Sequence, residues 1–211
     1  MDVFGSKLMQ MADPLSVLTI GHSTHSWKCF ASLLHGSGVT AVADVRTSPY
    51  SRRYPHFNRD ELRETLRRDG LLYVFLGYEL GGRPKEPQFY SNGVADYEKM
   101  AKTKEFSNGL SRVVEGAKSY RVALLCSEHD PLNCHRCLLV GRALSENGVR
   151  VSHILDRGGV ATQVEIEDRL LELYDHRAHD LFLPRADRLV EAYRARARKV
   201  AFAQRPAPTA T

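Results

Sequence analysis

The sequence predicts an α/β fold of three layers, in which helices cover both faces of a mostly parallel sheet and a helical, basic tail follows. Short apolar runs alternate along the chain with longer segments whose apolar residues repeat at helical spacing. Several of the short runs stop abruptly at polar or titratable residues. The hydrophobic content of 43% over 211 residues suits one domain with a substantial core.

The first half of the domain is expected to hold three strands joined by helices. Runs of apolar and β-branched residues predict these strands at residues 15–20, 39–43 and 71–76. After Ser26, a capping residue, apolar residues repeat at helical spacing through His35. A second helix is expected to begin after Asn58, also a capping residue, and to end at Arg68 before an Asp-Gly pair.

Residues 47–58 contain too many prolines, tyrosines and arginines for a regular element, and residues 83–93 are expected to form a second irregular loop. Irregular segments of this length inside a compact domain are usually either functional or disordered. The aromatic residues Tyr50, Tyr54 and Phe57 favour an ordered loop for the first segment.

The second half of the domain is expected to add strands at residues 121–125 and 149–155. Helical spacing predicts helices at residues 96–106, 107–117 and 134–146. Right-handed crossovers between parallel strands bring the carboxyl ends of the strands to one edge of the sheet. Because open α/β sheets bind their ligands at that edge, functional residues are expected there.

The chain is expected to divide into a loose arm at residues 1–14, the α/β domain at 15–160 and a mainly helical, basic extension at 161–211. The net charge of +5 and the pI near 9.1 favour anionic partners. Much of the positive charge falls in a predicted helix after Pro184, on Arg185, Arg188, Arg194, Arg196, Arg198 and Lys199. A solvated helix face is the simplest interpretation, and nucleic-acid binding or a homodimer contact are the alternatives.

The composition favours a cytoplasmic protein without a membrane partner. No apolar run approaches the roughly 20 residues that a membrane-spanning helix needs. The first residues lack the basic-then-apolar order of a signal peptide. Cys126, Cys134 and Cys137 cluster in the sequence, which in a reducing compartment favours chemistry, metal binding or redox response over structural disulfides.

The stretch from Arg121 to Arg142 carries the strongest functional signal. A buried strand is expected to end on Cys126, and after a polar loop a helix is expected to begin near Cys134. Thiols, a carboxylate, imidazoles and a guanidinium lie between these points. Since strand ends that face a helix N-terminus commonly bind ligands, the stretch predicts a functional site.

Cys126 is the first candidate nucleophile, because a nearby helix N-terminus or cation lowers the pKa of a thiol. Cys134 competes for this role, and Cys126 is alternatively a small residue of the core. Either cysteine can also resolve an oxidised state formed on the other.

The carboxylates Glu128 and Asp44, which follow two different strands, are the expected general acid and base. Asp44 alternatively forms a structural ion pair with Arg46 or Arg52. His135, beside Cys134 in the sequence, is a further catalytic candidate.

Guanidinium groups on two loops are expected to bind an anion, since they hold phosphate or carboxylate through paired hydrogen bonds. The arginines of this expected clamp are Arg46, Arg52, Arg53 and Arg136. His22 and Ser23 follow the first strand, so they are expected near the same edge. His22 and His153 are alternatively histidines of the core, and for His153 this is the favoured interpretation.

Zinc is an alternative for the clustered cysteines. The candidate ligands of a closed site are Cys126, Cys134, Cys137 and one of His129 or His135. The sequence CHRC supplies a single CxxC pair, which is weak support for zinc. A catalytic metal held by His22 and His135 is the other option. Because the sequence gives only weak support to either metal site, no metal and no other cofactor are expected.

Four motifs occur in order along the chain: TIGHSTHS (19–26), DVRTSPYSRRYPHFN (44–58), YVFLGYELGG (73–82) and LLCSEHDPLNCHR (124–136). Together they resemble the domain of unknown function 488 family over roughly residues 17–157. The segment 180–182 and the arginine-rich helix after it also resemble a tail that some relatives carry. The resemblance implies a single α/β domain whose motif residues gather at one site, with no settled activity.

The hallmark positions implied by this resemblance are His22, Ser23, Asp44, Arg46, Pro49, Ser51, Arg52, Phe57, Cys126, Glu128, Cys134, His135 and Arg136. Cys137 falls outside them. With Ser51 added on this ground, the residues expected to bind the substrate are His22, Ser23, Arg46, Ser51, Arg52 and Arg136.

The favoured hypothesis is an enzyme, a cysteine-dependent hydrolase or transferase, that acts on a small anionic substrate such as a nucleotide or a modified base. One alternative is a nucleic-acid-binding accessory protein that uses the basic C-terminal helix and stacks bases on its loop aromatics. The other alternative is a redox sensor in which Cys126 and Cys134 form a reversible disulfide.

Overall fold

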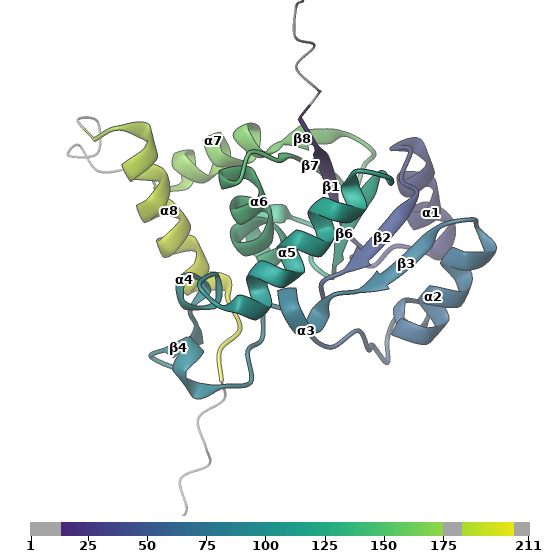
Figure 1. Cartoon of the computed structure of the whole chain (residues 1–211), viewed down its shortest axis with the longest axis horizontal. Helices are drawn as coiled ribbons and strands as arrows, with labels where there is room; N and C mark the ends of the chain where they lie inside the picture. Colours follow the sequence, from purple (N-terminus) through teal and green to yellow (C-terminus); the bar gives the residue numbers. More distant parts are fainter. Residues whose placement is uncertain (1–13, 175–182, 205–211) are drawn as a thin grey trace, which may run out of the picture.

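The computed structural model describes residues 14–174 and 183–204. Its main sheet has six strands in the order β3-β2-β6-β1-β7-β8 (Figure 1). The strands are β1 (Ser16–Gly21), β2 (Ala41–Asp44), β3 (Leu72–Phe75), β6 (Val122–Cys126), β7 (Arg150–Ile154) and β8 (Val160–Thr162). All neighbouring strands pair in parallel except β7 and β8, which are antiparallel. The predicted mostly parallel sheet is confirmed.

The helices of the described residues are α1 (Trp27–Gly36), α2 (Arg59–Arg68), α3 (Gly77–Leu80), α4 (Tyr97–Met100), α5 (Lys104–Ala117), α6 (Arg142–Glu146), α7 (Gln163–Tyr174) and α8 (Arg185–Val200). A π-helical turn over Arg136–Gly141 leads directly into α6. None of these helices has the length and apolar character that crossing a bilayer requires. Most of the predicted arm and the motif at 180–182 lie outside the described residues.

Helices cover both faces of the sheet, as the alternation of apolar runs predicts. On β6, Leu124 belongs to a core shared with α5, α7 and α8, whereas its neighbour Leu125 belongs to a core shared with α1 and α2. Successive side chains of a strand point to opposite faces, so a strand buried on both sides is apolar throughout. Figure 1 shows α1 and α2 on one side of the sheet and α5 and α6 on the other.

The two predicted helix caps differ in outcome. The hydroxyl of Ser26 accepts a hydrogen bond from the backbone N–H of Cys29 at 3.3 Å, which confirms Ser26 as the cap of α1. The side chain of Asn58 makes no cap bond to α2. Its Oδ1 instead accepts from the backbone N–H of Ser51 at 2.6 Å, so Asn58 ties the 47–58 loop to the helix.

The predicted boundary between the helices at 96–106 and 107–117 was wrong. The chain instead breaks after Met100, and α5 begins at Lys104. The hydroxyl of Thr103 accepts from the backbone N–H of Phe106 at 3.1 Å and thereby starts α5. The apolar spacing runs through both helices, which hid the capping threonine between them.

The segment predicted as an irregular loop at 83–93 contains part of a hairpin. Strands β4 (Tyr90–Ser91) and β5 (Val94–Ala95) pair antiparallel around Asn92 and Gly93. Both turn residues have positive φ, 52° and 75°, the backbone that an Asn-Gly hairpin turn adopts. The Asn-Gly pair was the available signal for this hairpin.

The helices of the predicted C-terminal extension pack into the main core. Leu170 of α7 and Tyr193 of α8 belong to the same buried cluster as the strands. After α8 the chain returns to the small hairpin, where the N–H of Ala95 donates to the carbonyl of Phe202 at 2.9 Å. The last described residues therefore lie beside the segment that precedes α4.

Candidate functional site

The carboxyl ends of β2 and β6 open into a pocket of about 280 Å³. Its wall includes Arg46, Arg83, Cys126, Glu128, Cys134 and His135. Larger hollows of about 420 and 510 Å³ have no cysteine or histidine in their walls, and one of about 610 Å³ has His56 but no cysteine. Reactive chemistry is therefore concentrated in the smaller pocket, at the sheet edge where the sequence predicts a site.

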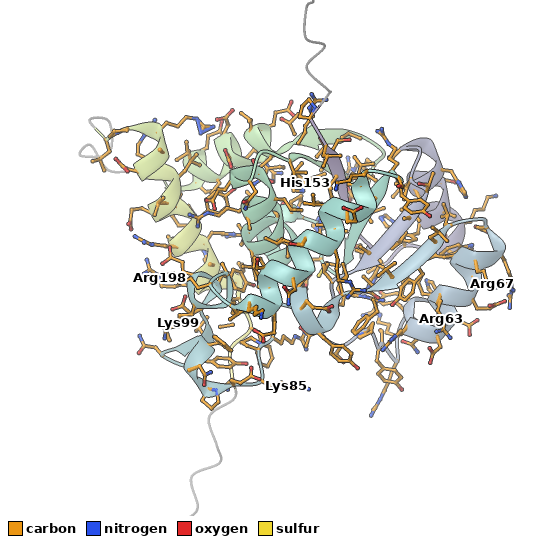
Figure 2. All side chains as sticks on the ribbon, viewed as in Figure 1. Arg63, Arg67, Lys85, Lys99, His153 and Arg198 are labelled. Atoms are coloured by element: carbon orange, nitrogen blue, oxygen red, sulfur yellow. The ribbon has the colours of Figure 1, made fainter. Side chains whose placement is uncertain are left out.

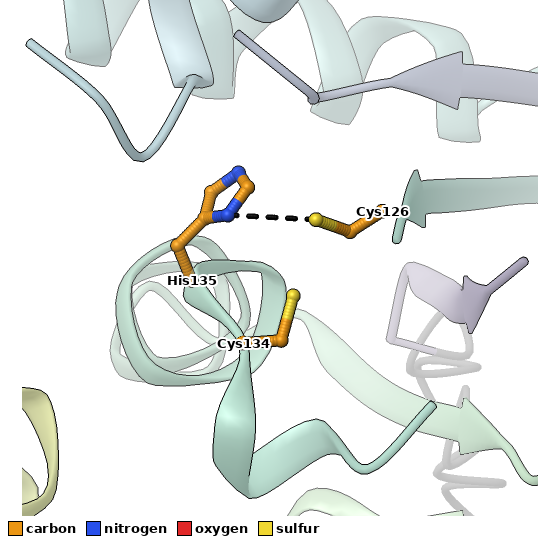
Figure 3. A group of neighbouring side chains, drawn as sticks. All are labelled: Cys126, Cys134 and His135. Atoms are coloured by element: carbon orange, nitrogen blue, oxygen red, sulfur yellow. Dashed lines mark hydrogen bonds between the residues drawn. The ribbon is translucent and has the colours of Figure 1, made fainter. Parts of the chain in front are cut away.

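Two thiols and an imidazole meet in this pocket (Figure 3). Cys126 ends β6, while Cys134 and His135 precede the π-helical turn. One ligand atom from each of these three residues lies within 4.8 Å of the others. Cys126 and Cys134 are 3% and 2% exposed and form no disulfide, so both thiols remain available for chemistry.

The ring of His135 is held in one orientation. Its Nε2 lies 2.8 Å from the carbonyl oxygen of Val45, which can only accept, so Nε2 carries the proton. Nδ1 lies 3.5 Å from Sγ of Cys126. Burial alone would lower the pKa of His135, but the hydrogen bond with Cys134 and the charge of Cys134 raise it above its usual range. Gly82 packs on the other side, because a Cβ at Gly82 would lie only 2.6 Å from Cγ of His135.

Cys126 and Glu128 form a hydrogen-bonded pair at the pocket wall. The Cys126 thiol donates to Oε2 of Glu128 at 3.1 Å. Burial raises the pKa of the Cys126 thiol well above its usual range, and the hydrogen bond with Cys134 raises it further. Desolvation also raises the pKa of the Glu128 carboxyl. Cys126 therefore holds its proton, and Glu128 is placed to accept it.

The pKa of the Cys134 thiol is shifted in the opposite direction from that of Cys126. Burial alone would raise its pKa, but the hydrogen bond from Cys126 and the charge of Arg136 hold the pKa of the Cys134 thiol well below its usual range. The backbone N–H of Arg136 also donates to Sγ of Cys134 at 3.4 Å. Of the two cysteines, Cys134 is therefore the one that carries thiolate character.

Arg136 lies outside the wall of this pocket, and its guanidinium is bound by groups of the protein itself. Its side chain is fully buried. One guanidinium nitrogen donates to the carbonyl of Glu128, and another donates to the carbonyl of His129 at 2.9 Å. Nε donates to the hydroxyl of Thr19 at 3.3 Å. Arg136 thus fixes the loop that carries Glu128 and sets a positive charge behind Cys134.

Asp44 forms the ion pair with Arg46 that the sequence predicts as an alternative to acid–base catalysis. Nε and Nη2 of Arg46 donate to the Asp44 carboxylate at 2.8 and 2.6 Å. The hydroxyl of Tyr73 donates to the same carboxylate at 2.8 Å. Asp44 is fully buried and absent from the pocket wall, so its geometry favours an ion-pair role over acid–base chemistry. Arg46 itself does line the pocket.

The remaining residues expected to bind the substrate lie outside the wall of this pocket: His22, Ser23, Ser51 and Arg52. The ring of His22 stacks on Phe57 at 4.3 Å, and burial lowers the pKa of His22 to about 4. The hydroxyl of Ser51 accepts from the N–H of Tyr54 at 3.1 Å and so holds a turn. Arg53 lies over the ring of Tyr54. The expected four-arginine clamp is therefore not assembled.

His153 is a satisfied histidine of the core, as favoured from the sequence (labelled in Figure 2). Its Nε2 donates to Oε1 of Gln163 at 2.8 Å, and the hydroxyl of Thr19 donates to its Nδ1 at 2.8 Å. Burial lowers the pKa of His153 to about 4. Both ring nitrogens of the neutral form are thus paired.

Cys137 stands apart from the other clustered cysteines. It is fully buried, and Nε2 of Gln163 donates to its Sγ at 4.0 Å. Burial raises the pKa of Cys137 to about 12. The closed site with Cys137 as a ligand is therefore not formed, and the described residues that can hold a metal together are Cys126, Cys134 and His135.

The pocket wall includes residues that sequence reasoning missed, among them Arg83, Tyr97, Val200 and Phe202. The Arg83 guanidinium lies 5.0 Å from the centre of the Phe202 ring, so the end of the chain forms part of the rim. The Gly81-Gly82 pair before Arg83 was a signal of close backbone approach. No local pattern marked Tyr97 or Phe202.

Comparison with known proteins gives one family. The family model described as "Domain of unknown function DUF488" matches residues 26–143, more than half of the chain. The matched segment includes every sequence-predicted catalytic residue. No curated protein and no solved structure matches the chain.

Proposed function

The chain belongs to the DUF488 family, and we propose that it is an enzyme that hydrolyses or transfers a group on a small anionic substrate. The family description names no reaction, so the proposal rests on the pocket. The observation that carries it is the gathering of Cys126, Glu128, Cys134 and His135 around one pocket with Arg46 in its wall. Sulfur, carboxylate, imidazole and cation together supply a reacting centre, a proton acceptor and an anion anchor.

Arg46 is suited to anchor the anion. It is 4% exposed, and two of its guanidinium nitrogens are fixed by Asp44. Among the described residues no partner is found for its third nitrogen, Nη1. A guanidinium that is already oriented by a carboxylate loses little entropy on binding a further acceptor. The exposed Arg83 adds a second cation at the rim.

The rim also favours a substrate with a flat ring. Phe202 is 37% exposed, and the guanidinium of Arg83 lies over its face. Arginine planes and aromatic faces are the surfaces on which bases stack. A pocket of about 280 Å³ is near the lower limit for ligand sites, which suits a nucleotide-sized molecule better than a polymer.

A thermal-shift screen of the full chain tests this function. The probes are inorganic phosphate, nucleoside monophosphates, nucleosides and short oligonucleotides. A monophosphate at about a hundred times its Kd should add about 2.7 kcal/mol to the free energy of unfolding, which raises Tm measurably. Arg83→Gln should weaken binding about tenfold, about 1.4 kcal/mol, because it removes one cation from the rim.

The matched control is Arg67→Gln, which removes an exposed arginine from α2 and should leave binding unchanged. The absence of a Tm shift with every small anion tested would contradict the proposal. An equal ligand-induced Tm shift in Arg83→Gln and Arg67→Gln would show that the ligand does not bind at the rim of this pocket. That result would also contradict the proposal.

Nucleic-acid binding through α8 has less support. Arg185 pairs with Asp168, Arg194 pairs with Glu98, and Arg196 donates to the carbonyl of Leu132. These arginines attach the helix to its own domain. Figure 2 shows Lys85, Lys99 and Arg198 on one side of the molecule and Arg63 and Arg67 on the other.

A redox sensor is the second candidate, favoured by the closeness of the two buried thiols Cys126 and Cys134. A thiolate next to a protonated thiol is the arrangement from which a disulfide forms on oxidation. Paired loss of these two thiols in mild oxidant, reversed by a reductant, is the result that would favour this function.

A further inference from the structure

We propose that Cys126, Cys134 and His135 bind a divalent zinc ion. The inference deepens the proposed function, on whose pocket it rests, because it gives the sulfur atoms the role of metal ligands. Two thiolates and one imidazole are a ligand set that zinc prefers. In catalytic zinc sites, three protein ligands leave a fourth position for water or substrate.

The separation of the Cys126 and His135 ligand atoms fits a tetrahedral ion. Zinc lies about 2.3 Å from a cysteine sulfur and about 2.0–2.1 Å from a histidine nitrogen, so these two ligands are about 3.5 Å apart in a tetrahedral site. Sγ of Cys126 and Nδ1 of His135 are separated by 3.5 Å. All three ligand atoms lie within 4.8 Å of one another.

The orientation of His135 is an independent observation that points to a metal. A metal-binding histidine usually donates its other ring N–H to a carbonyl or carboxylate, which fixes the ring and its tautomer. The Nε2–H of His135 donates to the Val45 carbonyl at 2.8 Å, and Gly82 leaves room for the ring. Nδ1 is thereby turned toward Sγ of Cys126, beside the second sulfur (Figure 3).

The charges around the site also suit a divalent ion. A bound zinc ion would displace the remaining thiol proton, and two thiolates with the Glu128 carboxylate would then balance the ion and the buried guanidinium of Arg136. Without the ion, Arg136 pairs only with carbonyl and hydroxyl oxygens and the thiol cluster. Buried charges are stable only when they are paired.

Glu128 and Arg46 line the same pocket as the three proposed ligands. The Glu128 carboxylate is 3.1 Å from Sγ of Cys126, and both residues line the pocket. A ligand in the fourth position would therefore meet a carboxylate that can accept a proton and a cation that can hold an anion. Cys137, one turn further, is too far removed to close the site.

Metal content of the full-length chain tests this inference without an activity assay. The chain, purified with reductant and dialysed against zinc, should retain an equimolar amount of zinc by mass spectrometry. Cobalt added to chelator-treated chain should give a thiolate-to-cobalt charge-transfer band and the visible bands of a four-coordinate ion. Cys126→Ser, Cys134→Ser and His135→Gln should each weaken zinc binding at least tenfold.

The matched control is Cys137→Ser, which alters a buried cysteine outside the site and should keep full zinc binding. Absence of retained zinc and of the cobalt bands in folded wild-type chain would overturn the inference. So would equal zinc loss in Cys137→Ser and Cys134→Ser, or a Cys126–Cys134 disulfide in freshly reduced protein. A monophosphate thermal shift that persists in metal-free chain would leave the proposed function standing in each case.

Discussion

Replacing Arg136 by alanine is expected to lower the free energy of unfolding by about 3–5 kcal/mol, because it removes the central donor of a fully buried network. The carbonyls of Glu128 and His129 would each lose their hydrogen-bond partner, at about 1–3 kcal/mol for a buried group. The hydroxyl of Thr19 would lose a donor too. Urea unfolding followed by circular dichroism measures the loss.

Two further variants separate this network from a general effect of charge. Arg136→Lys keeps the positive charge, but an ammonium group lacks the planar set of donors that reaches both carbonyls. The free energy of unfolding of Arg136→Lys should therefore lie between those of wild type and Arg136→Ala. Arg67→Ala removes an exposed arginine paired with Glu64 and should leave the unfolding midpoint unchanged. A loss below about 1 kcal/mol in Arg136→Ala would show that these contacts do not hold the loop.

Gly21→Ala is expected to cost about 3 kcal/mol or more, although it adds one methyl group. A Cβ at Gly21 would lie 1.8 Å from the carbonyl oxygen of Glu128 and 2.7 Å from its carbon. Backbone hydrogen bonds hold the two segments together, from His22 to Cys126 and from Ser23 to Ser127. Because the obstructing atoms are backbone, relief requires the loop that carries Glu128 to move.

The matched control for this variant is Gly36→Ala. Gly36 ends α1 and has no heavy atom within 4 Å of an added Cβ. Alanine favours a helix over glycine by up to about 1 kcal/mol, so this change should be neutral or stabilising. Thermal unfolding of both variants gives the comparison, and equal Tm values would contradict the close approach at Gly21.

Most of the fold follows from local sequence patterns. The strands β1, β2, β6 and β7 and the helices α1 and α2 coincide with apolar runs and capping signals within one to three residues. The short strand β8 and the hairpin of β4 and β5 were missed, because strands of two or three residues carry almost no periodicity. Only the Asn92-Gly93 pair marked the hairpin.

The candidate site could be predicted in its reactive residues but not in its cations. Cys126, Glu128, Cys134 and His135 lie close in the sequence, and a strand–loop–helix unit brings them together. Arg136 has the same residue type as an anion-binding arginine, but two carbonyls of the preceding loop occupy its guanidinium. Such partners are set by tertiary packing, which no sequence pattern shows.

The rim of the pocket depends on contacts across long separations. Arg83 follows β3, whereas Phe202 follows α8, and the ring contact between them joins distant parts of the chain. The sequence predicted helix α8 as part of a separate C-terminal extension because this segment is rich in arginine. Arg185 and Arg194 instead pair within the domain, and Phe202, which follows the helix, lines the pocket.

The central claim is that an anionic ligand and the sulfur centre share one pocket. The most direct test measures the alkylation rate of each cysteine in metal-free chain by mass spectrometry, with and without the nucleoside monophosphate that gives the largest thermal shift. Cys29 is exposed and reports reagent activity, while the buried Cys137 lies outside the pocket and reports global unfolding. The ligand should slow alkylation of Cys126 and Cys134 at least tenfold beyond any change at Cys137. Unchanged rates at Cys126 and Cys134 in saturated protein, or equal slowing at Cys137, would contradict the claim.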